Sequence, residues 1–312
     1  MKLIMDLKQI LFGIDDIKAR GQLDLDINLI TQNSNEAKEN SIFVAIKGFE
    51  TDGHKYIKNA IENGCKVVIV NQDCDKQIIK EISKDITIIA VPDTRIALAK
   101  MACNFYGEPS KKLKLVGITG TKGKTTTSFM IKKILEKQGY KVGLIGTIAI
   151  YIGDRKLEDS ERTTPDSLKL QNIFKQMVDE KCDVAVMEVS SQSLKLHRVD
   201  YCDFDIGIFT NFSEDHISPK EHPNMEDYFN SKLKLVDMCK TCYVNADDLH
   251  MAKIPKLFPE KDITTYGIDN FCKILAKDIT ITNSYVDFKI KLGDRNERVK
   301  AGIPGRFSVY NS

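Results

Sequence analysis

Short apolar runs rich in β-branched residues recur along the chain, and each has the length and composition of a buried strand. Three of them, residues 42–46, 67–70 and 86–91, lie in the first third of the sequence. Two more, residues 115–118 and 184–187, lie further along. Helix-forming stretches separate the runs, and this alternation predicts α/β domains with mostly parallel sheets.

A glycine-rich loop, residues 117–127, joins one of these runs to a helix. Glycine occupies its first, fourth and seventh positions, and Lys124 and three threonines follow. Apolar residues with helical spacing begin at Ile131, and Gly139 is suited to end that helix. Glycines let backbone N–H groups converge on an anion, and the helix N-terminus adds a positive dipole end. The loop is typical of a nucleotide phosphate site, with Lys124 near the β- and γ-phosphates and the Thr125 hydroxyl on Mg²⁺.

The spacing of this loop departs from the common phosphate-binding pattern. The loop reads G-x-x-G-x-x-G-K-T-T, whereas the pattern G-x-x-x-x-G-K-[ST] would place a glycine where Ile118 stands. A glycine turn that only caps the helix is therefore the alternative. The intact Gly-Lys-Thr core between a strand and a helix favours the phosphate site.

Polar side chains follow two further strands. Glu188 directly follows the run 184–187, and a strand predicted over residues 205–210 leads into a polar segment that ends with Asp215 and His216. Ligands of open α/β sheets bind beyond the carboxyl ends of the strands. We therefore expect Glu188 to hold Mg²⁺ or to orient a water, with a surface-facing glutamate as the alternative. For His216, a functional role and an ordinary packed or solvated side chain are both open.

A helix predicted over residues 225–237 carries a lysine within its apolar stripe. The residues on this face are Met225, Tyr228, Phe229, Lys232, Leu233 and Val236. Their spacing places all of them on one side of the helix. Burying an unpaired ammonium group is costly, so Lys232 needs a partner, a modification or a path to water. Snorkelling of its charged end into solvent is the alternative.

Length, composition and charge exclude some classes of protein. The chain has 312 residues, enough for two domains that each have a core, and its 42% apolar and 29% charged residues are ordinary for a soluble protein. With 46 basic and 44 acidic residues, the net charge of +2 gives no reason to expect a nucleic-acid or membrane partner. The sequence contains no apolar run long enough to span a membrane and no signal-peptide pattern at its N-terminus, so we expect a cytoplasmic protein.

The eight cysteines are scattered along the chain. Only Cys239 and Cys242 form a C-x-x-C pair, and the sequence shows neither a second pair nor a histidine doublet near them. A structural zinc site uses four ligands at suitable spacing. We therefore expect reduced, partly buried thiols rather than a metal site.

Together these stretches resemble the Mur ligases, the ATP-dependent amide-bond-forming enzymes of bacterial cell-wall synthesis. The glycine loop looks like the phosphate-binding loop of that family, with Ile118 at the position that departs from the common form. Six further motifs follow in the order typical of the MurE group. They are TTPD at 163–166, MEVSSQ at 187–192 with HRV at 197–199, FTN to DH at 209–216, YF to K at 228–232, VNADD at 244–248 and PGRF at 304–307.

The first part of the chain resembles the uridine-nucleotide-binding domain of the same family more loosely. Residues 41–48 and 51–54 carry this resemblance. The segment Asn33-Ser34-Asn35 stands where the family has Asp-Ser-Arg. The resemblance therefore implies a nucleotide contact at Ser34, while Asn35 lacks the arginine group that the family uses.

The resemblance also implies a role for each group of site residues. The ATP-binding residues would be Gly120, Thr121, Lys122, Gly123, Lys124, Thr125, Thr126, Asn245 near the adenine, and Arg306. The residues that hold the muramoyl-peptide substrate would be Ser34, Thr163, Thr164, Ser190 and Arg198. Thr125, Glu188 and His216 would hold Mg²⁺, and the catalytic residues would be Lys124, Glu188, His216 and Lys232. Lys232 is the position that the family carbamylates, which turns a buried cation into an anion suited to a Mg²⁺ site.

The implied fold is α/β, with a small N-terminal domain over residues 1–108 and a central P-loop ATPase domain over residues 109–312. The third domain of the family, which carries the amino-acid site, is missing, so we expect part of a longer enzyme that cannot complete ligation alone. The implied reaction adds L-lysine or meso-diaminopimelate to UDP-N-acetylmuramoyl-L-alanyl-D-glutamate through an acyl-phosphate, as a step of peptidoglycan synthesis. We expect a monomer.

Two alternatives stay open. The first is another ligase of the superfamily, such as a folylpolyglutamate synthetase, although the TTPD and EVSS…HR motifs and the front domain disfavour it. The second is a nucleotide-binding module without catalytic activity. The presence of Lys124, Glu188, His216 and Lys232 together disfavours the second, because a mere binder has no need of the full metal set.

Overall fold

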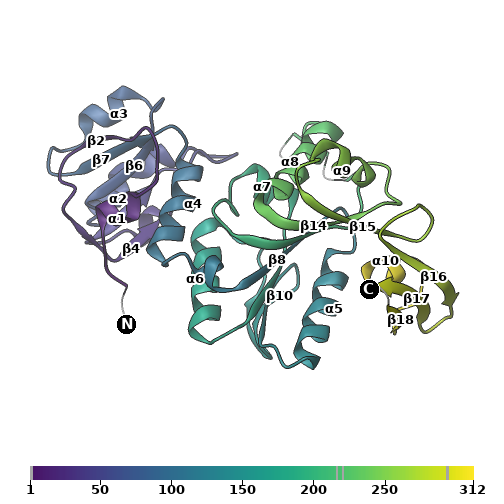
Figure 1. The fold of residues 1–312 in the computed structure, drawn as a ribbon. Coiled ribbons are helices and arrows are strands. Elements are labelled where there is room, and N and C mark those ends of the chain that lie inside the picture. The colour runs from purple at the N-terminus through teal and green to yellow at the C-terminus, as the bar shows by residue number, and fades with distance from the viewer. Residues whose placement is uncertain (1–2, 216, 220, 293–294) are drawn as a thin grey trace. The chain divides into compact units, whose positions relative to one another are not determined.

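The computed structural model describes residues 3–215, 217–219, 221–292 and 295–312, and these residues divide into two units (Figure 1). The first unit consists of Met1–Pro109, Asp166–Lys175 and Leu196–Tyr201, and the second consists of Ser110–Pro165, Gln176–Lys195 and Cys202–Ser312. Each unit contains a sheet of its own and is described separately. Among the described residues, no helix combines the length and the apolar character needed to cross a bilayer.

The first unit is built on a five-stranded sheet of order β2-β7-β6-β5-β4, in which β4 to β7 are parallel and β2 is an antiparallel edge strand. The strands are β2 (Lys18–Arg20), β4 (Leu29–Thr31), β5 (Ser41–Val44), β6 (Val67–Asn71) and β7 (Thr87–Val91), with a separate pair β1 (Met5–Asp6) and β3 (Asp26–Ile27). The helical segments are α1 (Leu7–Leu11), η1 (Ser34–Glu36), η2 (Gly53–Tyr56), α2 (Ile57–Glu62), α3 (Lys76–Glu81) and α4 (Thr94–Phe105).

Both faces of this first sheet are buried. Val67 and Ile69 belong to one apolar cluster, whereas Val68 and Val70 on the opposite face belong to another. A strand buried on both faces must be apolar at every position, which explains why β6 reads as an uninterrupted apolar run. The strands predicted over residues 42–46, 67–70 and 86–91 are thereby confirmed as β5, β6 and β7.

The second unit contains an eleven-stranded sheet of order β11-β10-β9-β12-β8-β13-β14-β15-β16-β17-β18. Its parallel centre consists of β8 (Lys114–Thr119), β9 (Val142–Ile145), β12 (Val184–Glu188), β13 (Phe204–Phe209), β14 (Cys239–Asn245), β15 (Asp262–Gly267) and β16 (Ile274–Ile281). Its antiparallel ends consist of β10 (Ala149–Ile152), β11 (Arg155–Asp159), β17 (Val286–Leu292) and β18 (Arg295–Ala301). The α/β class with mostly parallel sheets is therefore confirmed.

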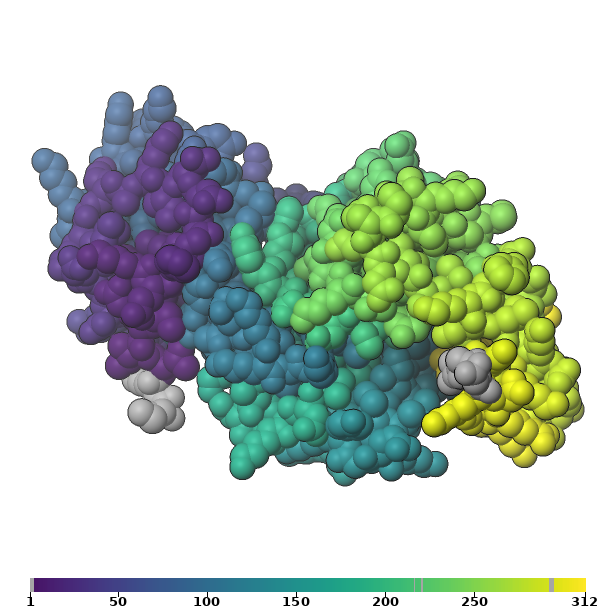
Figure 2. All heavy atoms as spheres, in the orientation of Figure 1, coloured from purple at the N-terminus to yellow at the C-terminus, as the bar shows by residue number. Residues whose placement is uncertain are grey.

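The remaining helical segments belong to the central and C-terminal parts of the sequence. They are η3 (Pro109–Lys112), α5 (Lys124–Lys137), α6 (Ser167–Asp179), α7 (Ser191–Lys195), α8 (Met225–Met238), η4 (Met251–Lys253), α9 (Ile254–Leu257) and α10 (Phe307–Asn311). The predicted helix over 225–237 is α8, and Gly139 follows the end of α5 with a φ of 90°, as predicted for a residue that ends a helix. The antiparallel strands near the C-terminus have no counterpart in the sequence predictions. Figure 2 shows the atoms of this part of the chain in yellow-green to yellow.

The neighbouring strands β8 and β13 are parallel, but the strands that follow each of them are added on opposite sides of the pair. From β8 the chain passes through α5 to β9 on one side, and from β13 it passes through α8 to β14 on the other. Right-handed crossovers in opposite directions place α5 and α8 on opposite faces of the sheet, as Figure 1 shows. Ligands of such sheets bind at this switch point, beyond the carboxyl ends of the strands. The loop after β8 is therefore the place to look for a site.

Candidate nucleotide-binding site

The loop between β8 and α5 has a backbone that only glycine adopts easily. Gly120 and Gly123 have φ values of 144° and 89°. A Cβ at Gly120 would collide with the Thr210 hydroxyl, and one at Gly123 would lie 2.5 Å from Asn311 Oδ1. Two of the three glycines of the motif are thus required by conformation and by close neighbours. Beyond Gly123 the helix α5 begins at Lys124, as the sequence predicts.

Residues at the end of the adjacent strand hold the first half of this loop in place. Asn211 accepts hydrogen bonds from the Thr121 amide at its backbone oxygen and from the Lys122 amide at its side chain, both at 2.9 Å. The Asn211 side chain and the Thr210 hydroxyl both donate to the Lys122 carbonyl at 2.8 Å. The backbone N–H groups of the first turn of α5 have no acceptor within their helix. The amides of residues 124–126 are therefore the ones that can receive a phosphate.

Two lysine side chains converge on the carbonyl groups of the loop. Lys124 Nζ donates to Gly120 O at 2.9 Å and to Thr121 O at 3.0 Å. Lys232 Nζ, from α8, donates to the same Gly120 oxygen at 3.0 Å and lies 4.4 Å from the centre of the Tyr228 ring. Lys232 is only 2% exposed, so the alternative that its charged end reaches solvent is wrong. These contacts place Lys232 beside the phosphate loop.

Burial shifts the protonation of both amines in the same direction. It lowers the pKa of Lys124, with the negative charges of Glu188 and Asp215 opposing the shift. Burial also holds the pKa of Lys232 well below the usual value for lysine, and the positive charge of Lys124 adds to this effect while Asp215 opposes it. Two cations close together in a buried site destabilise each other. The site therefore favours a neutral amine at Lys232.

A carboxylate at the end of β12 lies against the first turn of α5. Glu188 is 1% exposed, which excludes the surface-facing alternative. Thr125 Oγ1 donates to Glu188 Oε2 at 3.0 Å. Thr147 also binds this carboxylate, through its amide to Oε1 and its hydroxyl to Oε2, both at 3.0 Å. Two hydroxyl groups and one amide thus donate to the Glu188 carboxylate and fix its orientation toward Thr125.

Thr147 is a site residue that the sequence reasoning missed. It lies just beyond β9, which pairs in parallel with β12, and so its side chain meets the end of the strand that carries Glu188. Next to it, Gly146 leaves room for the carboxylate, because a Cβ there would collide with Glu188 Oε1. A Gly-Thr pair directly after an apolar run was the signal that could have revealed it.

Three of the predicted substrate-binding residues gather around the same strand end. Thr164 Oγ1 donates to Glu188 O at 2.8 Å and accepts from the Ser190 amide at 3.1 Å. Thr163 Oγ1 lies 3.1 Å from Thr147 Oγ1. The hydroxyl of Thr164 is therefore a bridge that holds the segment before α6 to the end of β12. Through these contacts Thr163 and Ser190 join the group of polar residues around Glu188.

The other predicted residues have different surroundings. The buried Asn245 donates to Thr210 O at 2.8 Å and accepts from the Asp247 amide at 2.9 Å, so it ties β14 to the end of β13. Arg306 forms an ion pair with Asp269. Lys122 is exposed, Thr126 lies in the first turn of α5, and His216 lies outside the described residues.

Two predicted substrate residues, Ser34 and Arg198, belong to the first unit. Ser34 is buried, and its carbonyl oxygen accepts a hydrogen bond from the Asn63 side chain at 2.9 Å. In the neighbouring motif at 51–54, His54 Nδ1 lies 2.6 Å from Asp52 Oδ1, and His54 Nε2 accepts from the Asn71 amide at 3.1 Å. Both ring nitrogens of His54 are therefore used inside the unit.

The eight cysteines are free thiols, seven of them buried, and Cys239 and Cys242 both lie on β14. Within the described ranges, no group of three or more His, Cys, Asp and Glu side chains is arranged to hold a metal ion. The thiols are more fully buried than the partial burial expected from the sequence.

Comparison with known proteins gives a consistent family relationship. The model of the Mur ligase middle domain matches residues 118–312, and that of the Mur ligase family, catalytic domain, matches residues 26–106. A UDP-N-acetylmuramoyl-L-alanyl-D-glutamate–2,6-diaminopimelate ligase of Clostridium botulinum is 47% identical over 289 residues, which cover 92% of this chain and 58% of that protein. A relative with the same name from Caldanaerobacter subterraneus is 44% identical, over 99% of this chain and 62% of that protein.

A solved structure with the same ligase name superposes with a TM-score of 0.82 at 23% identity, over 98% of this chain and 61% of that one. At this identity the superposition establishes the fold alone. The chain spans about three fifths of the length of the curated relatives it matches, between 58% and 62% for those compared above.

Proposed function

The chain belongs to the Mur ligase family, and we propose that it provides the nucleotide-binding and muramoyl-peptide-binding parts of an ATP-dependent amino-acid ligase. The reaction would join the third amino acid of the peptidoglycan precursor to UDP-N-acetylmuramoyl-L-alanyl-D-glutamate. The single observation that carries the proposal is the 3.0 Å contact between the Thr125 hydroxyl of the loop and the Glu188 carboxylate of the adjacent strand. A loop hydroxyl beside a strand-end carboxylate is the donor set with which ATPases hold Mg²⁺ at the phosphates.

The residues present fit a Mg²⁺ ion. Oxygen donors suit this hard cation, and a buried carboxylate oriented by Thr125 and Thr147 is placed to serve it directly or through water. When bound, Mg²⁺ would neutralise charge on the β- and γ-phosphates. Thr125 and Glu188 would hold it, and His216, which lies outside the described residues, is proposed as a further ligand.

The first chemical step would be phosphoryl transfer to the substrate carboxylate. A carboxylate oxygen attacks the γ-phosphorus of ATP, the bond to the β–γ bridging oxygen breaks, and an acyl-phosphate and ADP form. Lys124 would leave the loop carbonyls and stabilise the charge on the transferring phosphoryl group. The amine of the incoming amino acid then attacks the acyl carbon, phosphate leaves, and the amine loses a proton. Thr163, Thr164, Ser190 and Arg198 would hold the muramoyl-peptide.

Lys232 would act as a carbamate. Its low pKa supplies the neutral amine that attacks CO₂, and the nitrogen loses one proton as the N–C bond forms. The resulting anion would lie next to the Lys124 cation instead of a second cation. Incubation with ¹³C-bicarbonate should give a carbamate resonance that disappears in Lys232→Ala. A wild-type spectrum without that resonance, at a pH where the amine is neutral, would contradict this assignment.

We propose diaminopimelate rather than L-lysine as the incoming amino acid, because the relatives at 47% and 44% identity carry that name. In a protein that includes the amino-acid-binding domain of the family, ADP formation in the presence of ATP, Mg²⁺ and the UDP-muramoyl-dipeptide should then be stimulated by meso-diaminopimelate more than by L-lysine. Equal or reversed stimulation would contradict the choice. ATP as nucleotide, a cytoplasmic location, a monomeric state and the domain division at 108/109 belong to the same proposal.

One binding experiment tests the proposed class of substrate. Calorimetric titration with UDP-N-acetylmuramoyl-L-alanyl-D-glutamate should show saturable binding, whereas a folate polyglutamate should show none. Binding of the folate instead would favour a folylpolyglutamate synthetase. A protein that binds ATP but shows no binding of the muramoyl-peptide would favour a nucleotide-binding module.

A further inference from the structure

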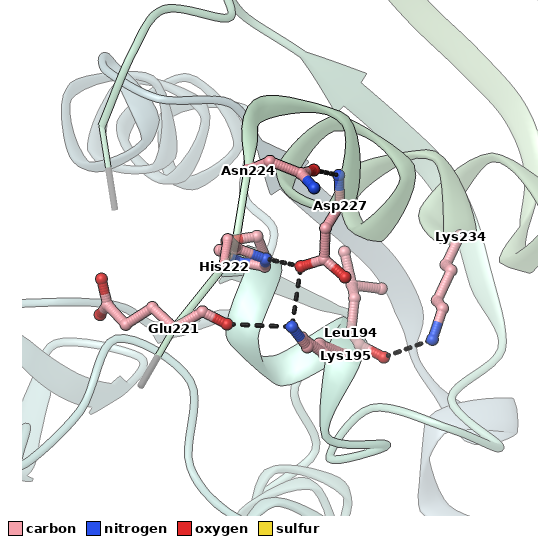
Figure 3. Close-up of polar contacts among 8 residues, drawn as sticks. Leu194, Lys195, Glu221, His222, Asn224, Asp227 and Lys234 are labelled. Carbon is pink, nitrogen blue, oxygen red and sulfur yellow. Dashed lines mark hydrogen bonds and ion pairs between the residues drawn. The ribbon is translucent and has the colours of Figure 1, made fainter. Parts of the chain in front are cut away.

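Three polar side chains of the second unit, two of them buried and the third partly exposed, form a hydrogen-bonded chain that the proposed mechanism does not use. His222 Nε2 lies 2.8 Å from Ser191 Oγ, and His222 Nδ1 lies 2.6 Å from Asp227 Oδ2. Figure 3 shows that Lys195 reaches the same Asp227 oxygen, at 2.8 Å. Ser191 is 4% exposed and His222 is fully buried. Buried polar atoms are tolerated when each is paired, so these contacts fix the side chains relative to one another.

The protonation of this chain follows from its partners. A carboxylate can only accept hydrogen bonds, so His222 Nδ1 carries the proton that points to Asp227, and Nε2 accepts from the Ser191 hydroxyl. Burial lowers the pKa of His222, Asp227 opposes the shift, and the charges of Lys195 and Lys232 add to it. Burial tends to raise the pKa of Asp227, but its bonds to Lys195 and His222 lower it overall. A neutral imidazole and a charged carboxylate are therefore the stable pair.

The two ends of the chain lie on the two elements that border the candidate site. Ser191 is the first residue of α7, three positions after Glu188. Asp227 lies in the first turn of α8, whose N-cap Asn224 accepts from the Asp227 amide at 2.8 Å. The same helix carries Lys232. The hydrogen bonds from Ser191 through His222 to Asp227 therefore join the start of α7 to the start of α8.

An aromatic ring extends this connection to the phosphate loop. The His222 and Tyr228 rings lie 5.0 Å apart between centres, and the Tyr228 hydroxyl lies 3.2 Å from Thr121 Oγ1. The Tyr228 ring also lies 4.4 Å from Lys232 Nζ and 5.0 Å from the centre of the Phe212 ring. A displacement of His222 would therefore shift Tyr228, and with it both Thr121 and Lys232.

We propose that Ser191, His222 and Asp227 are positioning residues that keep Lys232 in register with Glu188 and the phosphate loop. The inference rests on the function proposed above. Groups around a metal ion must be held to within about 0.5 Å, and residues that orient the ligands typically change metal affinity about 10- to 100-fold when they are removed. The same three residue types form the nucleophilic triad of hydrolases, but here the serine and the histidine are buried and no substrate carbonyl can reach them.

The test measures ATP affinity in the presence of Mg²⁺ and in the presence of a chelator. The first affinity divided by the second isolates the metal-dependent part of binding. Ser191→Ala removes the hydroxyl donor, and Asp227→Asn removes the charge that fixes the imidazole tautomer. Each variant should lower the ratio about tenfold while ATP affinity in the chelator changes less than about twofold. Both should also reduce the ¹³C-carbamate resonance of Lys232. General destabilisation would lower both affinities together and leave the ratio unchanged.

Ser110→Ala is the matched control. Ser110 is a fully buried serine in the same unit, near the amino end of β8, and it accepts one hydrogen bond from the Asp203 amide at 3.3 Å. This variant should keep the wild-type ratio and the carbamate resonance. A wild-type ratio in folded Ser191→Ala and Asp227→Asn would overturn the positioning role. A wild-type protein without any Mg²⁺ enhancement would instead overturn the proposed function.

Discussion

The phosphate loop of the second unit and the 51–54 motif of the first unit both resemble nucleotide-binding segments, yet their side chains do different things. At the loop, Lys124 Nζ donates to two backbone carbonyl groups, which a phosphate can replace as its partner, and Lys232 Nζ from α8 donates to one of them. In the motif, His54 uses both ring nitrogens within the unit, on Asp52 and on the Asn71 amide. The comparison teaches that the loop has a charged group that can exchange its partner for a ligand, whereas the His54 ring of the 51–54 motif is already bonded within its own unit.

The largest effect is expected from Lys124→Ala, which tests the ligand-facing half of the comparison. The change removes a charged donor from the phosphates, and charge-assisted hydrogen bonds contribute roughly 1.5–3 kcal/mol, or about 10- to 100-fold in affinity. Calorimetry with Mg²⁺-ATP measures it. Lys137→Ala, at the exposed far end of the same helix, is the control. Equal affinity in the wild type and Lys124→Ala would remove the loop from nucleotide binding.

His54→Ala should show the opposite behaviour in the first unit. It leaves the Asn71 amide without its acceptor, removes the ring that contacts Asp52 and opens a cavity, so the free energy of unfolding should fall by about 2 kcal/mol. Mg²⁺-ATP affinity of the folded variant should stay at the wild-type value. Denaturant unfolding and calorimetry together check both parts. A stable variant that has lost UDP binding would instead make His54 a ligand-contacting residue.

Gly146→Ala tests the part of the loop site where Glu188 meets Thr125 and where we propose the metal ion binds. The added methyl group would press on Glu188 Oε1, and overpacking of this kind typically costs about 1–3 kcal/mol. We expect Mg²⁺-dependent ATP affinity to fall about tenfold, since the carboxylate must move away from Thr125. Gly302→Ala, where a Cβ meets nothing within 4 Å, should behave as the wild type. Unchanged affinity in Gly146→Ala would show that the position of Glu188 is not critical.

The smallest effect is a pH dependence at Asp52. Burial tends to raise its pKa, but the hydrogen bonds from the amide and ring of His54 outweigh this and lower the pKa overall. A depressed carboxyl pKa adds stability above the unfolded-state value near pH 4, and this is lost as the pH falls through the folded-state value. Partial exposure limits the effect to a few tenths of a kcal/mol. Unfolding at pH 5 and pH 2.5 should show a smaller loss in Asp52→Asn, and an identical loss would contradict the assignment.

The sequence predicted the parts of the site that lie within one continuous motif. The glycine loop was predicted from the spacing of its glycines, and Lys232 was predicted from its place in the apolar face of a helix. Both signals are local in the sequence. Thr147 was not predicted, and Asn211 was named only within a motif and given no role. Their partners Glu188 and Lys122 lie 41 and 89 positions away in the sequence and meet them only through strand pairing. The link between Ser191 and Asp227 has the same origin.

The fold shows a similar division. Five of the parallel strands, β5 to β8 and β12, were predicted because they read as short apolar runs. The strand β9 was not predicted, although all four of its residues are buried. The strands β16 to β18 were missed because their exposed faces carry many charged residues, which hide the apolar positions from a search for continuous runs. The roles of Ser34 and Arg198 stay predictions, since no feature of the sequence places them relative to the loop.

The central proposal, that Thr125 and Glu188 hold the metal ion of a nucleotide on the loop, is tested most directly by a crystal structure with Mn²⁺ and a non-hydrolysable ATP analogue. We predict an anomalous peak at ligand distance from Thr125 Oγ1 that contacts Glu188 directly or through one water. The phosphates should lie over the amides of residues 124–126, with Lys124 turned toward them. A nucleotide bound elsewhere, or a metal ion that contacts neither Thr125 nor Glu188, would contradict the proposal.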